Sequence, residues 1–198
     1  MKNIAVIGSG GLGREVLGII QSINRKENSW NFIGFYDDNL SNDFINGFPI
    51  LGQIDELNQI NEELNVVIAI GNPKIKKLIK NKIVNSQIKF PTLIHPSVEI
   101  YSEENVVLGK GVVIAANSVL TVNIEISDFV YINTAAVIAH DTKIGKYSMI
   151  MPTVSISAGG EIGEKVYIGN GTKIDYYVHI KNNEIIPAGS VLTKINPI

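Results

Sequence analysis

The chain of 198 residues contains no cysteine, which excludes disulfides, thiolate metal ligands and cysteine nucleophiles. Charged residues make up only 18%, and 17 basic against 19 acidic side chains give a net charge of −2, which argues against a basic surface for nucleic acid. No apolar run approaches the ~18 residues of a membrane-spanning helix. The N-terminal residues run directly into a strand and a glycine turn, unlike a signal peptide. We therefore expect a cytoplasmic protein without a membrane span.

Aromatic residues are scarce as well, at 7%, although 45% of the chain is hydrophobic. Isoleucine alone accounts for 34 residues, so the apolar content consists mainly of branched aliphatic side chains. Such side chains fit strands well, and a chain this apolar is not disordered. The composition therefore predicts a folded protein rich in strands.

The first 90 residues alternate apolar runs with amphipathic segments. The apolar runs predict buried strands at residues 3–7, 32–36 and 66–70. Apolar residues at helical spacing predict helices at residues 14–23 and 74–84, whereas residues 54–63 are weakly helical. Because strands and helices alternate, this part of the chain is predicted to form an α/β unit with a parallel sheet.

The second half of the chain is a hexapeptide repeat. From Leu108 onward, every sixth residue is leucine or isoleucine, over sixteen positions that end at Ile198. We call these positions the isoleucine ladder. Alternate residues of a strand share a face, so the ladder and the mostly small or β-branched residues two positions earlier point inward in a parallel β-helix. Three hexapeptides close one coil, and coils stack about 4.8 Å apart. We assign the ladder to the core and give it no chemistry.

Short motifs occur along the chain in a specific order: GSGGLGREV at 8–16, FYDD at 35–38, AIGNP at 69–73, LIHPS at 93–97 and INTAAVIAHDTKIG at 132–145. Together they resemble the bacterial family of sialic acid O-acetyltransferases and UDP-amino-sugar N-acetyltransferases, over nearly the whole chain. The resemblance implies a Rossmann-like, nucleotide-sugar-binding domain at residues 1–90. It also implies a left-handed β-helix acetyltransferase domain at 91–198, acetyl-CoA as co-substrate, no metal, and a homotrimer with active sites between subunits.

The glycine-rich turn after the first strand is a candidate phosphate site. It contains Gly8, Gly10, Gly11 and Gly13 and fits the pattern that brings backbone N–H groups and a helix N-terminus to a phosphate. A plain tight turn is one alternative and NAD binding is another. Only about 90 residues precede the β-helix, half of a dinucleotide-binding fold, so a single nucleotide or its sugar diphosphate fits better than NAD.

Three further residues are candidates for the nucleotide-sugar site. Asp37 and Asp38 end the second strand, where a carboxylate can accept hydrogen bonds from ribose or a base, and a solvated turn is the alternative. Gly71 ends the third strand and is expected at the same crevice. The sequence departs from the family at Leu12, where relatives often have a polar residue.

The three histidines limit the choice of a general base. We expect His95 to be structural and His179 to lie on the surface. His140 and Asp141 are predicted at a corner of the β-helix, and the resemblance identifies them as the catalytic base and the acid that orients it.

The acetyl-CoA site is expected along the β-helix. Ala158 and Gly159 lie one coil after His140 and are small enough to let a pantetheine arm approach the backbone, and an N–H near Ala158 would stabilise an oxyanion. The resemblance adds one acceptor-side residue and three acetyl-CoA-binding positions: Asn133, and then Met149, Gly169 and Asn170. Met149 is a departure, because some relatives carry histidine there.

The sequence thus predicts direct acetyl transfer, because no cysteine is present to carry an acyl group. We expect an N-acetyltransferase that acts on the amine of a nucleotide-linked amino sugar in bacterial surface glycan biosynthesis. O-acetylation of sialic acid or another sugar hydroxyl stays open, since the same base would serve both reactions. A non-catalytic, trimeric nucleotide-sugar-binding scaffold is the alternative from another class.

Overall fold

The computed structural model describes residues 1–39 and 43–193 of the chain. These residues form two compact units, which divide between Pro91 and Thr92. The last position of the isoleucine ladder, Ile198, lies outside the described residues. Within the described ranges, no helix combines the length and the apolar character needed to cross a membrane.

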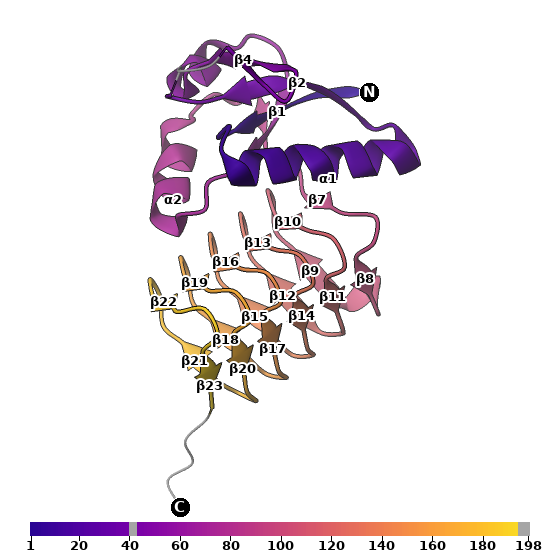
Figure 1. Ribbon diagram of the computed structural model, residues 1–198, viewed down its shortest axis with the longest axis vertical. Helices are drawn as coiled ribbons and strands as arrows, with labels where there is room; N and C mark the ends of the chain where they lie inside the picture. Colours follow the sequence, from indigo (N-terminus) through magenta and orange to yellow (C-terminus); the bar gives the residue numbers. More distant parts are fainter. Residues whose placement is uncertain (40–42, 194–198) are drawn as a thin grey trace, which may run out of the picture. The chain divides into compact units, whose positions relative to one another are not determined.

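The first unit is a six-stranded sheet with the strand order β3-β4-β2-β1-β5-β6 (Figure 1). Neighbouring strands run parallel except for β3, which is antiparallel to β4. The strands are β1 (Lys2–Ile7), β2 (Trp30–Tyr36), β3 (Phe44–Ile45), β4 (Phe48–Gly52), β5 (Leu64–Ile68) and β6 (Ile88–Lys89). The helices are α1 (Gly11–Glu27), the 3-10 helix η1 (Ile54–Gln59) and α2 (Pro73–Lys82). The predicted α/β unit is confirmed, and the structure adds β3, β4 and β6 to the three predicted strands.

The glycine-rich turn allows α1 to begin close against β1. Gly8 has a φ of 96°, which side chains rarely tolerate. A Cβ atom placed on Gly13 would collide with the carbonyl oxygen of Gly8. Glycine at position 13 therefore sets the close approach of helix to strand, which is one of the roles that glycine has in nucleotide-binding turns.

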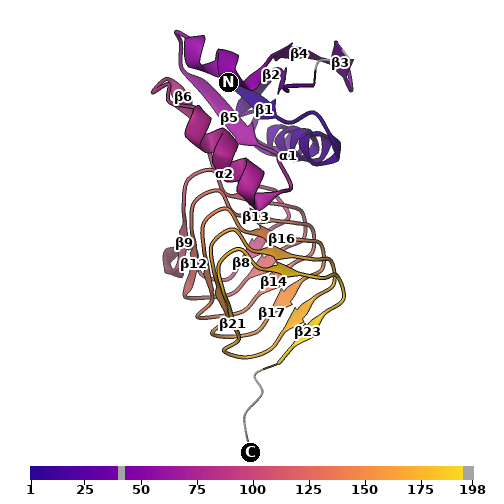
Figure 2. The same cartoon turned by 90° about the vertical axis from the view of Figure 1, so that its left-hand side faces the viewer.

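The second unit stacks parallel strands into the three faces of a prism (Figures 1 and 2). Face 1 contains β7 (Leu93–Ile94), β10 (Val113–Ile114), β13 (Tyr131–Ile132), β16 (Met149–Ile150), β19 (Tyr167–Ile168) and β22 (Ile185–Ile186). Face 2 contains β8 (Glu99–Ile100), β11 (Val119–Leu120), β14 (Val137–Ile138), β17 (Ser155–Ile156), β20 (Lys173–Ile174) and β23 (Val191–Leu192). Face 3 contains β9 (Val106–Leu108), β12 (Ile124–Ile126), β15 (Lys143–Ile144), β18 (Glu161–Ile162) and β21 (His179–Ile180).

Two corners of the prism matter for function. Corner 1–2 follows each face 1 strand and comprises residues 95–97, 115–117, 133–135, 151–153, 169–171 and 187–189. Corner 2–3 follows each face 2 strand and comprises residues 101–105, 121–123, 139–141, 157–159 and 175–177.

The pairing register shows a parallel β-helix with coils of 18 residues. The predicted left-handed β-helix fold is confirmed. Tyr131 lies opposite Met149, and Met149 lies opposite Tyr167. The first coil is longer, because Leu93 pairs with Val113, 20 positions along the chain. Its extra residues lie at corner 2–3 in the 3-10 helix η2 (Glu103–Asn105). Steps of six from Leu108 therefore miss β7 and β8, which precede this longer turn.

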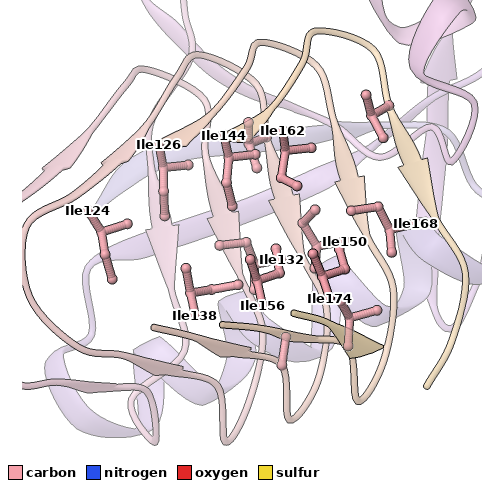
Figure 3. Close-up of a cluster of buried hydrophobic side chains, with 14 of the residues drawn as sticks. Ile124, Ile126, Ile132, Ile138, Ile144, Ile150, Ile156, Ile162, Ile168 and Ile174 are labelled. Atoms are coloured by element: carbon pink, nitrogen blue, oxygen red, sulfur yellow. The ribbon is translucent and has the colours of Figure 1, made fainter. Parts of the chain in front are cut away.

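The isoleucine ladder fills the interior of the prism, as the sequence predicts. Figure 3 shows successive isoleucines pointing inward from the three faces and stacking from coil to coil. The ladder residues from Ile114 to Ile186 are all buried, and Leu108 and Leu192 at the ends are partly buried. Inward hydroxyls bond to corner carbonyls: Thr142 Oγ1 donates to Ala139 at 2.7 Å, and Ser148 Oγ donates to Gly163 at 2.8 Å. The polar atoms in the core are thereby satisfied at these positions.

Alanine at two glycines of α1 provides a test of the close approach to β1. Gly13→Ala is expected to lower the free energy of unfolding of the first unit by about 1–3 kcal/mol, because backbone must move. Gly18→Ala is the matched control: nothing lies within 4 Å of a Cβ there, and we expect a gain of roughly 0.5–1 kcal/mol from higher helix propensity. Urea unfolding followed by fluorescence of Trp30, the only tryptophan and part of β2, measures both. A shift of both variants in the same direction would contradict the close-packing argument.

Candidate functional site

His140 and Asp141 form the turn at corner 2–3 between β14 and β15. The coils on either side hold this turn: the Gly159 N–H donates to the His140 carbonyl at 2.9 Å, and the Asp141 N–H donates to the Val122 carbonyl at 3.2 Å. Asp141 has a φ of 61°, a left-handed conformation that aspartate adopts more readily than most residues. The backbone of the pair is therefore fixed by stacking, while both side chains remain about half exposed.

The two side chains are aligned for proton transfer. His140 Nδ1 lies 2.7 Å from Asp141 Oδ2. An ionised carboxylate only accepts hydrogen bonds, so the imidazole donates through Nδ1–H. In the neutral ring this leaves a lone pair on Nε2, which is able to accept a proton.

Asn123, one coil earlier at the same corner, holds the other carboxylate oxygen. Its Nδ2 donates to Asp141 Oδ1 at 3.1 Å. The hydrogen bonds from His140 and then Asn123 lower the pKa of Asp141 below its ordinary value. Sequence reasoning missed Asn123, although a polar residue 18 positions before Asp141 is a signal that the coil register makes readable.

In the next coil, the backbone N–H groups of Ala158 and Gly159 are the two candidate donors to an oxyanion. The Gly159 N–H is already used by the His140 carbonyl, whereas the Ala158 N–H makes no hydrogen bond within the described chain. Ala158 is only 3% exposed. The Ala158 amide is therefore a candidate donor that lies on a largely buried residue.

The remaining predicted β-helix residues lie elsewhere on the prism. Asn133, Gly169 and Asn170 are at corner 1–2, at the opposite edge of face 2 from His140. Asn133 is 4% exposed, and its Oδ1 accepts hydrogen bonds from the N–H and hydroxyl of Thr134 at 2.7 and 3.2 Å. Met149 is fully buried on face 1. A single chain does not bring these four residues to His140.

The other two histidines have local partners. His95 Nδ1 lies 2.8 Å from Ser97 Oγ in the turn after β7. His179 is exposed on face 3, with Nδ1 3.1 Å from Glu161 Oε2. Neither lies in the column of residues at corner 2–3 that contains His140 and Ala158.

In the first unit, the predicted residues gather at the carboxyl ends of three adjacent parallel strands. The glycine-rich turn follows β1, Asp37 follows β2 and Gly71 lies between β5 and α2. Cβ atoms on Gly10, Gly11 or Gly71 would meet nothing within 4 Å, so the space beside these backbones is open. This edge of the sheet is where parallel α/β folds bind nucleotides.

The two aspartates of this edge bond to the protein itself. Asp37 Oδ2 accepts hydrogen bonds from the N–H and hydroxyl of Ser9, each at 2.7 Å, and Oδ1 accepts from the Asn39 N–H at 2.9 Å. Burial tends to raise the pKa of Asp37, but these hydrogen bonds outweigh it and the net shift is downward. Asp38 Oδ1 accepts from the Ile54 N–H at 3.1 Å. Asp37 therefore fixes the glycine-rich turn in this structure, a role that the sequence did not reveal.

The two hydrogen bonds that Asp141 accepts, from His140 and from Asn123, provide a test of the site geometry. We expect His140→Gln to raise the pKa of Asp141 toward its ordinary value more than Asn123→Gly does, because the histidine bond is the larger cause of the lowered pKa. Glycine tolerates the left-handed φ of 54° at position 123, so only the amide is lost. Carboxyl ¹³C NMR titration measures the shift, and Asn183→Gly, another left-handed corner asparagine, is the control. An unchanged Asp141 pKa in both site variants would refute the arrangement.

Residues 3–83 match the family described as the PglD N-terminal domain. Over 175 residues the chain is 29% identical to GDP-perosamine N-acetyltransferase from Escherichia coli O157:H7, covering 88% of this chain and 78% of the relative.

Solved structures share the fold along almost the whole chain. The acetyltransferase domain of PglB from Neisseria gonorrhoeae FA1090 is 26% identical, with a TM-score of 0.86, covering 98% of this chain and 92% of that one. PerB from Caulobacter crescentus, solved in complex with CoA and GDP-perosamine, is 24% identical, with a TM-score of 0.85 and coverage of 98% and 90%. By sequence and by fold, the chain is similar to these bacterial acetyltransferases, and its residues 3–83 match the PglD N-terminal domain.

Proposed function

We propose that the protein transfers the acetyl group of acetyl-CoA to the amine of a nucleotide-linked amino sugar, in the cytoplasmic stage of bacterial surface glycan synthesis. The observation that carries the proposal is the His140–Asp141 pair, whose Nδ1–Oδ2 bond of 2.7 Å leaves Nε2 to act as a base. Similarity to a GDP-perosamine N-acetyltransferase over 88% of the chain supports the choice of an amino sugar as acceptor.

The mechanism follows from the residues at corner 2–3. The acceptor amine attacks the thioester carbonyl carbon, and His140 Nε2 takes the proton that the amine loses. Asp141 orients the ring and stabilises the imidazolium, while Asn123 holds Asp141. The carbon–sulfur bond then breaks, and the imidazolium returns its proton to the leaving thiolate. The Ala158 N–H is the candidate donor to the oxyanion in between.

The first unit is assigned the nucleotide part of the acceptor. The backbone beside Gly10 and Gly11 is open, and α1 begins there without an acidic residue in its first turn. N–H groups at a helix start attract phosphate through hydrogen bonds and the helix dipole. Asp37 supports this site from behind through Ser9.

A homotrimer would complete the active site. His140 and Ala158 lie at one edge of face 2, and Asn133, Gly169 and Asn170 lie at the other. The outward row of face 2 contains Glu99, Val119, Val137, Ser155, Lys173 and Val191, and the outward row of face 3 contains Val107, Glu125, Lys143, Glu161 and His179. Face 2 thus carries three valines in its outward row and face 3 carries one. Packing face 2 against a neighbour in a closed three-fold ring brings the edges of different subunits together.

Arginine in the outward rows tests the assembly. Val137→Arg on face 2 is expected to lower the sedimenting mass toward that of a monomer, because a charge would be buried at the contact. Val107→Arg, an exposed valine on face 3, is the control and should leave the mass unchanged. A trimer that survives Val137→Arg while Val107→Arg dissociates it would place the contact on face 3 instead.

The activity is tested with acetyl-CoA and UDP-, dTDP- and GDP-linked amino sugars, by following release of free thiol. We expect His140→Ala to lower turnover roughly 10²- to 10⁴-fold, the usual scale for loss of a general base, and His179→Ala to leave it unchanged. Equal turnover of wild type and His140→Ala would refute the assignment of the base.

Other outcomes of the same assay separate the remaining functions. Transfer to a sugar hydroxyl without transfer to any amine would indicate an O-acetyltransferase. No thiol release with any acceptor, together with no CoA binding by calorimetry, would indicate a scaffold.

A further inference from the structure

Helix α2 lies in a stretch of the chain whose charged side chains are all positive. Residues 64–98 contain six lysines and no aspartate or glutamate, whereas the rest of the chain has 11 basic and 19 acidic side chains. Five of the six lysines belong to α2: Lys74, Lys76, Lys77, Lys80 and Lys82. A protein with a net charge of −2 therefore has one strongly positive helix in its first unit.

The burial pattern of α2 shows which side of the helix faces solvent. Lys76 and Ile79 are buried at a spacing of three, on the side of α2 that packs inward, and the helix contacts β5 (Figure 2). Lys76 is only 2% exposed, and burial lowers the pKa of its ammonium group to about 7. The outer side is formed by Lys74, Leu78 and Lys82, which follow one another at a spacing of four.

On this outer side an apolar side chain lies between two lysines. Leu78 is 63% exposed, and Lys74 and Lys82 lie one turn before and one turn after it, at the spacing of neighbours on a helix face. Ile75, which is 47% exposed, lies beside Leu78. In the described part of the first unit, five large apolar side chains are exposed, and three of them belong to α2 or to the two residues after it. We call Lys74, Ile75, Leu78 and Lys82 the α2 surface.

The ion pair at the α2 surface is weak. Lys82 Nζ lies 3.9 Å from Asp55 Oδ1, and both side chains are more than half exposed. An exposed pair at this distance is screened by salt and water, so Lys82 can still bind another anion. Lys77 and Lys80 are half-buried beside the surface, and Lys80 Nζ lies over the ring of Phe90 at 5.2 Å. They add positive potential to the same side of the unit.

Lysines combined with exposed aliphatic side chains favour an anionic lipid surface over a nucleic acid. Nucleic acid phosphates would use the lysines but leave Leu78 and Ile75 in water, and surfaces that stack bases present aromatic rings instead. At a bilayer, aliphatic side chains enter the boundary between headgroups and acyl chains. Lysine stems lie along that boundary while their ammonium groups reach the lipid phosphates.

We propose that the α2 surface binds the headgroups of anionic phospholipids, so that the protein attaches peripherally to a negatively charged membrane. Leu78 and Ile75 enter the interface, and Lys74 and Lys82 pair with lipid phosphates. This inference goes beyond the proposed function and does not depend on it, because it involves neither the His140–Asp141 pair nor an acetyl donor.

Sedimentation of the whole chain with lipid vesicles tests the proposal. The vesicles contain phosphatidylcholine alone or phosphatidylcholine with about one-third phosphatidylglycerol. We expect the wild type to bind the anionic vesicles and not the neutral ones. Binding should weaken as salt is raised from about 0.05 M to about 0.5 M, because the lipid charge is then screened over a shorter distance. An absence of binding to anionic vesicles at low salt would refute the proposal.

Three variants test the individual contacts. Lys74→Gln combined with Lys82→Gln is expected to weaken binding roughly 10- to 30-fold, at about five-fold for each lysine. Leu78→Asn is expected to weaken it about 5- to 10-fold through loss of the buried aliphatic side chain. Asp55→Asn is expected to strengthen binding about 2- to 5-fold, because it removes a nearby negative charge and releases Lys82.

Matched controls lie away from α2. Lys26→Gln combined with Lys181→Gln removes the same charge from two exposed lysines. Val107→Asn removes an aliphatic side chain that is 63% exposed, as Leu78 is. We expect both controls to bind like the wild type. Equal weakening by the two double lysine variants would show that only total charge matters and would overturn the proposal.

Two other results would assign the α2 surface to a different partner. Duplex RNA that displaces the protein from vesicles, together with weakening by the lysine variant but not by Leu78→Asn, would indicate nucleic acid. A lower sedimenting mass of both variants in the absence of vesicles would indicate a contact with a second copy of the chain. Either result would overturn the assignment to lipid.

Discussion

The inward stacking of branched aliphatic side chains in a narrow prism is the constraint on which the second unit depends. Each coil supplies one ladder residue per face, and the ladder from Ile114 to Ile186 is buried throughout. Because these side chains stack in register, residues 18 positions apart occupy equivalent places on the surface. The alignment of Asn123, Asp141 and Gly159 at one corner follows from this register. The side chains at the corners are therefore positioned by the stacking of the aliphatic core.

A structural feature can be predicted from the sequence when the residues that produce it lie close together in the chain or recur at a fixed spacing. The isoleucine ladder is predictable because leucine or isoleucine recurs at every sixth position of the sequence. The turn from Gly8 to Gly13 is predictable because its glycines lie close together in the sequence. The strands β7 and β8 escape a search in steps of six, because the turn around η2 lengthens the first coil to 20 residues. The hydrogen bonds between Asp37 and Ser9 could not be predicted for a different reason: the two residues are 28 positions apart in the chain, and only the pairing of β1 with β2 brings them together.

In the candidate site, too, contacts between sequence neighbours could be predicted and the separation of distant residues could not. His140 and Asp141 are neighbours in the sequence, so their hydrogen bond requires only the left-handed turn at Asp141. Asn133 and Asn170 lie at corner 1–2, on the other side of face 2 from His140, so a single chain keeps them apart from it. The difference explains why motif reasoning could predict the pairing of His140 with Asp141 but grouped the pair with residues that a single chain keeps apart.

The coil register also determines how this architecture can change. An insertion of one residue within a strand would turn the following ladder residue out of the core, as a slip of one residue does in any half-buried strand, whereas the first coil accommodates its extra residues at a corner. Gain or loss of a whole coil preserves every inward position and moves later corners by about 4.8 Å along the axis. Distances between corner residues therefore vary in discrete steps rather than continuously. A prism of this kind can adapt to a longer or shorter ligand by changing the number of coils between two side chains, without altering either side chain.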